Sequence, residues 1–123
     1  MSFSYQGINH VQLAAPTGCE TEARNFYGRL LKMEEIEKPE NLKKREGVWF
    51  QCGNQQVHIG VQEDFVPAKK AHPAFEVRNF DYLKKHLIDQ ATIIIEDEAL
   101  DGYKRFFVND PFGNRIEFLE MID

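Results

Sequence analysis

Cysteine is scarce in this 123-residue sequence, which contains only Cys19 and Cys52. The two residues form neither a CxxC motif nor a dense cysteine framework, so the sequence excludes a disulfide-stapled scaffold and a cysteine-rich zinc site. We expect two free thiols in a reducing compartment. No apolar run approaches the roughly 20 residues of a membrane-spanning helix. The first residues, 1–5, lack the charged and apolar regions of a signal peptide, so the cytoplasm is the expected location.

Basic residues are also fewer than acidic ones. Fifteen lysines and arginines face 20 aspartates and glutamates, which gives a net charge of −5. A nucleic-acid-binding protein needs a basic face to displace counterions, and this balance argues against one. The short basic clusters at 43–45 and 69–70 are expected on solvated turns. The sequence has no Gly-rich phosphate loop, no nucleophile elbow and no Cys–His pair at useful spacing.

The remaining composition is that of an ordinary globular protein, with 42% apolar and 28% charged residues. A chain of this length suits one domain, or two small modules that share a core. Apolar periodicity in the first half predicts a strand at 8–15, a helix at 20–31, a short edge strand at 33–37 and a hairpin at 48–52 and 56–62.

After a linker at 66–70 the same order restarts. The pattern predicts a strand at 71–78, a helix at 80–90 and strands at 93–95, 104–109 and 115–121, with a strong turn signal at 110–114. An order that repeats after about sixty residues indicates duplication of one unit. We therefore expect an α+β fold with two βαβββ modules, at about 6–65 and about 70–123, in a single domain over 1–123. Each module should form a four-stranded, mixed and mostly antiparallel curved sheet covered by a helix.

Four polar residues fall inside predicted strands, at matching places of the repeat: His10, His58, His72 and Glu117. Strand alternation turns them away from the apolar faces that the helices must cover, and so potentially into one cavity. Three imidazoles and a carboxylate suit a divalent first-row metal such as zinc, iron, manganese, nickel or cobalt. A single strand histidine is more often a hydrogen-bonded structural residue than a ligand. From the residues alone, the metal site and the structural role both stay open.

Other residues alternate onto the same face as weaker candidates. Arg115 is a candidate partner for an anionic substrate, or for the carboxylates of Glu76 and Glu120. Trp49 and Phe107 are candidates for an apolar wall of the cavity or for the core. The fourth histidine, His86, falls on the polar side of the second predicted helix and is expected on the surface.

Two segments resemble a known superfamily. IleAsnHisValGlnLeu at 8–13 and PhePheValAsnAspProPheGlyAsnArgIleGluPheLeuGlu at 106–120 are similar to the first and last strands of the glyoxalase/bleomycin resistance/dioxygenase, or vicinal oxygen chelate, superfamily. The resemblance extends from about residue 8 to residue 120. It implies that the metal ligands lie on the first and last strands of each module, which by position are His10, His58, His72 and Glu117.

The resemblance leaves the subfamily and the activity open. Glyoxalase I usually has Glu where His58 stands, whereas extradiol dioxygenases use two His and one Glu, which His10, His72 and Glu117 could provide. The leading expectation is a metal-dependent lyase, isomerase or dioxygenase that acts on a small oxygenated substrate, with Glu117 as a general base. The alternatives are a non-catalytic drug-binding resistance protein and a structural zinc site. A homodimer is expected, and neither nucleic acid nor membrane is an expected partner.

Overall fold

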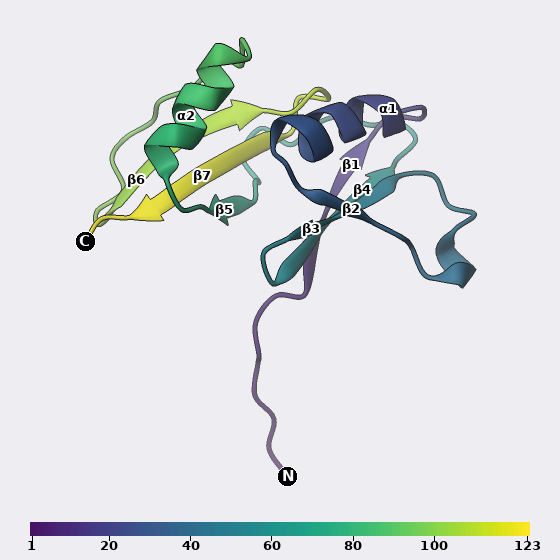
Figure 1. Cartoon of the computed structure of the whole chain (residues 1–123). Coiled ribbons are helices and arrows are strands. Elements are labelled where there is room, and N and C mark those ends of the chain that lie inside the picture. The colour runs from purple at the N-terminus through teal and green to yellow at the C-terminus, as the bar shows by residue number, and fades with distance from the viewer. The chain divides into compact units, whose positions relative to one another are not determined.

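Each half of the chain forms its own mixed sheet, with a helix between the first strand and the strands that follow (Figure 1). The structure is a computed structural model that describes residues 1–123. It divides into two units, Met1–Phe65 and Val66–Asp123. None of the helices is both long enough and apolar enough to cross a membrane. The mixed α+β fold class predicted from the sequence is confirmed.

Unit 1 contains a four-stranded sheet in the order β1-β4-β3-β2. Its strands are β1 (His10–Ala15), β2 (Glu34–Ile36), β3 (Val48–Cys52) and β4 (Gln55–Val61). β1 pairs with β4 in parallel over six residue pairs, from His10–Gln56 to Ala15–Val61. The β2–β3 and β3–β4 pairs are antiparallel, and the β3–β4 hairpin turns at Gly53, where φ is +57°.

The helix of unit 1 begins as α1 (Glu20–Ala23) and continues as a π-helical segment, Arg24–Leu30. At its end the Leu31 amide donates to the Phe26 carbonyl, five residues earlier, at 2.9 Å. The predicted helix at 20–31 is therefore present, but most of it has the wider π turn. Apolar periodicity alone does not distinguish an α-helix from a π-helix. Both place an apolar stripe, here Phe26 and Tyr27, toward the core.

Unit 2 contains a three-stranded sheet in the order β5-β7-β6. Its elements are β5 (Ala74–Glu76), α2 (Phe80–Asp89), β6 (Tyr103–Asn109) and β7 (Arg115–Met121). β5 and β7 are parallel, and β6 and β7 are antiparallel. Unit 2 thus repeats the parallel pairing of first and last strands that unit 1 shows.

The expected fourth strand of unit 2, at 93–95, is wrong. Only one bridge forms there, between Ile95 and Phe107. Beyond it, the Asp97 carboxylate accepts a hydrogen bond from the Glu98 amide at 2.7 Å. The expected strand is limited to a single bridge, and unit 2 has three strands instead of four.

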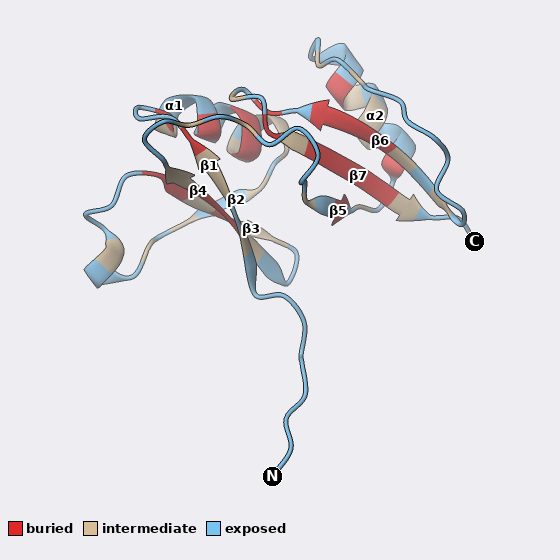
Figure 2. Cartoon of the chain, turned by 180° about the vertical axis from the view of Figure 1, so that it is seen from behind, coloured by how far each residue is buried: buried red, intermediate tan, exposed pale blue.

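Aromatic and aliphatic side chains fill one face of each sheet. In unit 1 the ring of Tyr27 contacts that of Phe50, and both are fully buried. In unit 2 Phe106 contacts Phe80 of α2 and Phe118 of β7. Figure 2 shows that much of β6 and β7 is buried. Burial of one such ring is worth roughly 2 kcal/mol, against roughly 0 to 1 for an exposed ion pair, so these faces rather than the surface charges hold the units together.

The turn between β6 and β7 forms where the sequence predicts it. The Asp110 carboxylate accepts hydrogen bonds from the amides of Phe112 and Asn114, at 2.9 and 2.8 Å. Gly113 has φ +91°, a conformation that a side chain would strain. The turn brings β7 back beside β6 and fixes the register in which Glu117 faces Phe107.

A second glycine, Gly47, ends the long loop between β2 and β3. Its φ is +105°, and a Cβ there would lie 2.2 Å from the Ile59 carbonyl oxygen, so no other residue fits. The Gly47 amide donates to the Glu20 carboxylate at the start of α1, at 2.7 Å. This hydrogen bond is the main reason that the pKa of Glu20 lies below its ordinary value of 4.5. The contact ties the end of the loop to the helix.

Replacing Glu20 with Ala should therefore lower the free energy of unfolding by about 1 kcal/mol at neutral pH, the usual worth of such a bond. Because the folded-state pKa of Glu20 is depressed, its contribution is full above the ordinary glutamate pKa. It is lost as the pH falls through the folded value. Urea denaturation at a series of pH values measures both effects. The control is Glu22→Ala in the same helical turn, since Glu22 is exposed and makes no ion pair. Equal losses in the two variants at every pH would contradict the assignment.

Candidate metal centre

The first pair of predicted ligands lies within unit 1, on two neighbouring strands. His10 begins β1 and His58 is in the middle of β4. In the parallel register His10 is opposite Gln56 and Gln12 is opposite His58, so the two histidines are diagonal neighbours on one face. Their rings stack with centroids 4.3 Å apart and planes 16° from parallel. The structure therefore brings these two predicted site residues together.

Trp49 extends this stack on its other side. It lies opposite His58 in the β3–β4 register, and the two rings are 3.7 Å apart and 3° from parallel. His58 is thus enclosed between His10 and Trp49, and only 4% of it is exposed. Of the two roles considered for Trp49, the structure supports a wall beside the candidate ligands.

Hydrogen bonds orient both imidazoles. The Gln56 amide oxygen lies 2.9 Å from Nε2 of His58, and the Asn9 amide oxygen lies 2.8 Å from Nδ1 of His10. With these amide oxygens as acceptors, Nε2 of His58 and Nδ1 of His10 would carry the proton, which leaves the lone pair on the other nitrogen of each ring. Each histidine therefore retains one nitrogen that can coordinate a metal ion.

The environment of His58 favours its neutral form. Burial is the larger cause that lowers the pKa of the His58 imidazole, and the charge of neighbouring His10 lowers it further. Both act in the same direction because each penalises a second positive charge in a confined place. The neutral imidazole is also the form that binds metals.

The second pair, His72 and Glu117, lies within unit 2. Glu117 is in β7, and only 5% of it is exposed. His72 was expected inside a strand and is instead two residues before β5. Pro73 explains this, because a proline has no amide hydrogen to donate to the ladder and the strand starts after it. Nε2 of His72 nevertheless lies 2.9 Å from Oε1 of Glu117.

The contact between His72 and Glu117 is suited to a cation. Nδ1 of His72 donates to the Lys70 carbonyl at 2.7 Å, so a neutral ring directs the lone pair of Nε2 at the carboxylate. Two lone pairs at hydrogen-bond distance repel unless a positive ion, either a proton or a metal, lies with them. The donor set therefore fits a divalent metal by its chemistry.

Arginines surround the second pair. Nη1 of Arg105 lies 3.5 Å from Oε2 of Glu117. The guanidinium groups of Arg105 and Arg115 lie 5.3 and 4.1 Å from the centre of the buried Phe107 ring, which also contacts His72 edge-on. Arg115 pairs with Asp97 at 3.0 Å, not with either carboxylate considered from the sequence.

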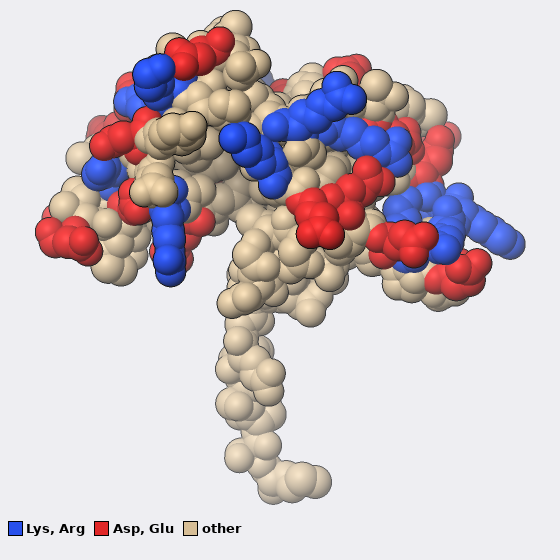
Figure 3. All heavy atoms as spheres, viewed as in Figure 1, with Lys and Arg blue, Asp and Glu red and all other residues tan.

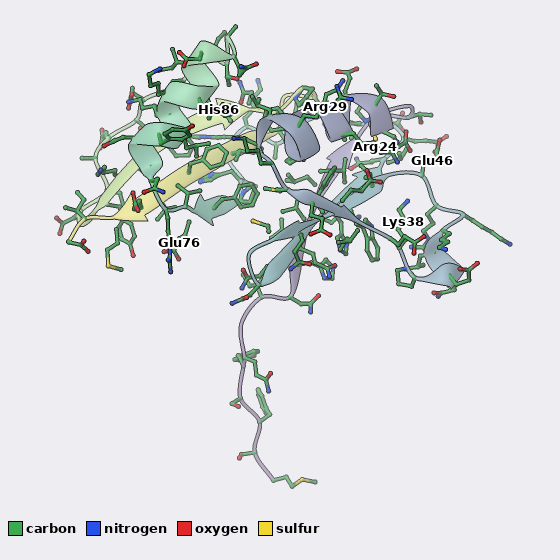
Figure 4. All side chains as sticks on the ribbon, viewed as in Figure 1. Arg24, Arg29, Lys38, Glu46, Glu76 and His86 are labelled. Atoms are coloured by element: carbon green, nitrogen blue, oxygen red, sulfur yellow. The ribbon has the colours of Figure 1, made fainter.

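Arg105 is the one neighbour of Glu117 that the sequence analysis missed. Arg105 and Phe107 are two residues apart in β6, so their side chains lie on the same face. This spacing could have identified Arg105 from the sequence. His86 is on α2 (Figure 4). α2 packs on Phe106, which points away from the face that carries Phe107 and Glu117.

Neither unit alone assembles three or more His, Cys, Asp or Glu side chains that could hold a metal ion. Each contributes one pair: two imidazoles in unit 1, and an imidazole with a carboxylate in unit 2. Cys19 and Cys52 are free thiols and belong to neither pair.

Comparison with known proteins gives the same family from sequence and from structure. Residues 7–118 match the sequence model of the family described as Glyoxalase/Bleomycin resistance protein/Dioxygenase superfamily. A solved structure described as a glyoxalase family protein from Bacillus anthracis is 59% identical, with a TM-score of 0.95 over 99% of this chain and 100% of that chain. No curated protein matches the chain.

More distant solved structures share the fold. A lactoylglutathione lyase from Agrobacterium tumefaciens has a TM-score of 0.74 at 19% identity, over 94% of both chains. A glyoxalase/dioxygenase from Nostoc punctiforme has a TM-score of 0.79 at 18% identity, over 96% of this chain and 92% of that chain. At such identities the likeness concerns the fold alone.

The ring stack predicts how His58 titrates. In metal-free protein the His58 imidazole should titrate below the ordinary histidine value of 6.5. In His10→Gln the pKa should rise, because the like charge is gone and the ring is less enclosed. Histidine-selective NMR titration in the presence of a chelator measures this. His86→Gln, which changes a histidine of the other unit, should leave the His58 curve in place. A wild-type value at or above 6.5 would refute the argument.

Proposed function

The chain belongs to the Glyoxalase/Bleomycin resistance protein/Dioxygenase superfamily, and on that premise we propose that it is a divalent-metal-dependent enzyme acting on a small oxygenated substrate. The reaction class is lyase, isomerase or dioxygenase. In this proposal His10, His58, His72 and Glu117 bind one metal ion, and residues 1–123 act as one domain of two modules. The observation that carries the proposal is the pair of oriented ligands in each unit.

The chemistry of the pairs supports a catalytic metal ion. Three imidazole nitrogens and one carboxylate oxygen suit zinc, iron, manganese, nickel or cobalt. Each histidine is held through its other nitrogen, by Asn9, by Gln56 or by the Lys70 carbonyl. Such outer partners fix the ring orientation and raise the affinity of a metal site.

A bound divalent metal supplies a Lewis acid that polarises a substrate oxygen and stabilises negative charge on it. Glu117 is the group that moves the proton in this proposal. Its carboxylate takes a proton from the carbon next to a substrate carbonyl and returns it at a neighbouring atom. The Arg105 guanidinium donates to one carboxylate oxygen of Glu117, so the base is positioned before substrate binds.

Purified protein should take up about one divalent ion per chain. His72→Ala should weaken metal binding by at least about tenfold, because one of the four proposed ligands is lost. Elemental analysis and titration with zinc, manganese and nickel measure this. His86→Ala is the matched control and should bind as the wild type does. Absence of metal after both measurements would overturn the site. Metal uptake without turnover of any vicinal dicarbonyl, epoxide or catechol substrate would instead favour the binding-protein alternative.

The same proposal includes a homodimer. Members of the superfamily commonly pair modules, and the two ligand pairs of this chain lie in different modules. We propose a two-fold symmetric dimer in which His10 and His58 of one chain and His72 and Glu117 of its partner bind each ion. The alternative is that each ion takes all four ligands from one chain.

Complementation between two mutant chains separates these assemblies. One chain carries His10→Ala and His58→Ala, and the other carries His72→Ala and Glu117→Ala. After joint unfolding and refolding, cross-chain assembly restores one complete site in each mixed dimer, so metal binding returns. Assembly within one chain restores none, and the mixture stays as poor as either mutant alone. Each mutant refolded by itself is the control.

A further inference from the structure

The loop between β2 and β3 encloses a pocket against the sheet of unit 1. The pocket has a volume of about 430 Å³. Its apolar and amide lining comes from Trp49, Leu42 and Gln12, and its charged lining from Lys38, Lys44, Arg45 and Glu46. All of these residues lie in unit 1, so the pocket is complete within that unit. Neither ligand pair lines it.

The pocket is positively charged in a protein that is negative overall. Three basic side chains oppose one carboxylate there, whereas the whole chain carries −5. Figure 3 shows basic side chains gathered over this end of unit 1, with acidic ones beside them. In Figure 4, Lys38 is on the segment that leaves β2 and Glu46 is on the segment that enters β3. The local charge favours an anion.

Two of the basic residues that line the pocket, Lys44 and Arg45, have no carboxylate partner. The side chains of Lys44 and Arg45 form no ion pair in the structure. Their neighbour Lys43 behaves differently: its ammonium lies 3.0 Å from Glu40 and 3.6 Å from Glu37, and it does not line the pocket. The expectation that residues 43–45 lie on a solvated turn holds for all three, which are exposed, but Lys44 and Arg45 also line the pocket. Lys38 is half-buried and donates to the Arg45 carbonyl, which braces the loop.

The floor of the pocket adjoins the first ligand pair. Gln12 is the register partner of His58, and its side chain lies over Gly60, where a Cβ would come 2.8 Å from the amide nitrogen. Gly60 therefore makes room for the Gln12 amide. Trp49 has one ring face covered by His58, which leaves its remaining surface for the pocket. A molecule in the pocket thus meets an aromatic wall and an amide beside His58.

We propose that this pocket binds the oxyanionic group, a carboxylate or a phosphate, of a small organic anion. Lys44 and Arg45 bind the oxyanion by charge-assisted hydrogen bonds, and an apolar part of the molecule lies against Trp49 and Leu42. As a statement about the substrate class, the inference rests on the proposed function. As a statement about binding, it requires no metal.

Trp49 makes the test direct, because it is the single tryptophan of the chain. Phenyl phosphate, benzoate and the neutral benzyl alcohol are titrated into chelator-treated protein while Trp49 fluorescence is recorded. We expect a saturable change with at least one of the two anions, and a much weaker response to benzyl alcohol. Whichever anion binds more tightly identifies phosphate or carboxylate as the preferred group. Added salt should weaken binding, because exposed charges are screened.

The decisive variant is Lys44→Gln, Arg45→Gln, and its matched control is Lys43→Gln. The double variant should weaken anion binding at least about tenfold, or about 1.4 kcal/mol, and the control should bind as the wild type does. Both variants change exposed side chains, and circular dichroism verifies that they fold. Anion binding that is unchanged in the double variant, binding equal to that of benzyl alcohol, or no binding of either anion would overturn the inference.

Metal titration of the same variants keeps the two proposals separate. Metal uptake should be unchanged in Lys44→Gln, Arg45→Gln, and anion binding should be unchanged in His72→Ala. A protein that binds the anions but no metal contradicts the proposed function alone. A protein that binds metal but neither anion contradicts the pocket alone.

Discussion

The parallel pairing between the first and last strands of each unit is the constraint on which both candidate ligand pairs depend. Parallel neighbours cannot be joined by a tight turn, so the chain must leave the sheet between them, and in each unit a helix lies in that connection. The helix covers one face with apolar side chains, which leaves the other face to polar ones. β1 beside β4 places His10 near His58, and β5 beside β7 places His72 near Glu117. The two members of each pair are 45 or more residues apart in the sequence, and the strand pairing brings them together.

Much of the fold could be read from the sequence because its signals are local. Strand alternation and turn residues predicted β3 and β7 at their observed bounds, and the turn that Asp110 organises followed from Pro and Gly at fixed places. The prediction was wrong elsewhere. Pro73 kept His72 out of β5, and the expected strand at 93–95 is only a single bridge at Ile95.

The candidate site was predictable only in part. The predicted strand positions and the superfamily resemblance named His10, His58, His72 and Glu117 as candidates, although His72 lies before β5 and not inside a strand. Their surroundings depend on register between strands that are distant in sequence. That Trp49 stacks on His58, and that Arg105 reaches Glu117, follows from cross-strand pairing and side-chain conformation, which no single segment encodes.

The contact between Gly47 and Glu20 has a consequence for how this fold can change. It anchors the far end of the β2–β3 loop to α1, while the near end leaves the sheet at Ile36. Both attachment points belong to regular elements, β2 and α1. The segment between Ile36 and Gly47 can therefore be exchanged without changing those elements. If the pocket binds an anion as we propose, exchanging this segment changes which anion binds without changing β1 and β4, the strands that carry His10 and His58. Under that proposal, the binding preference of unit 1 can diversify, in evolution or by grafting, independently of the candidate metal ligands.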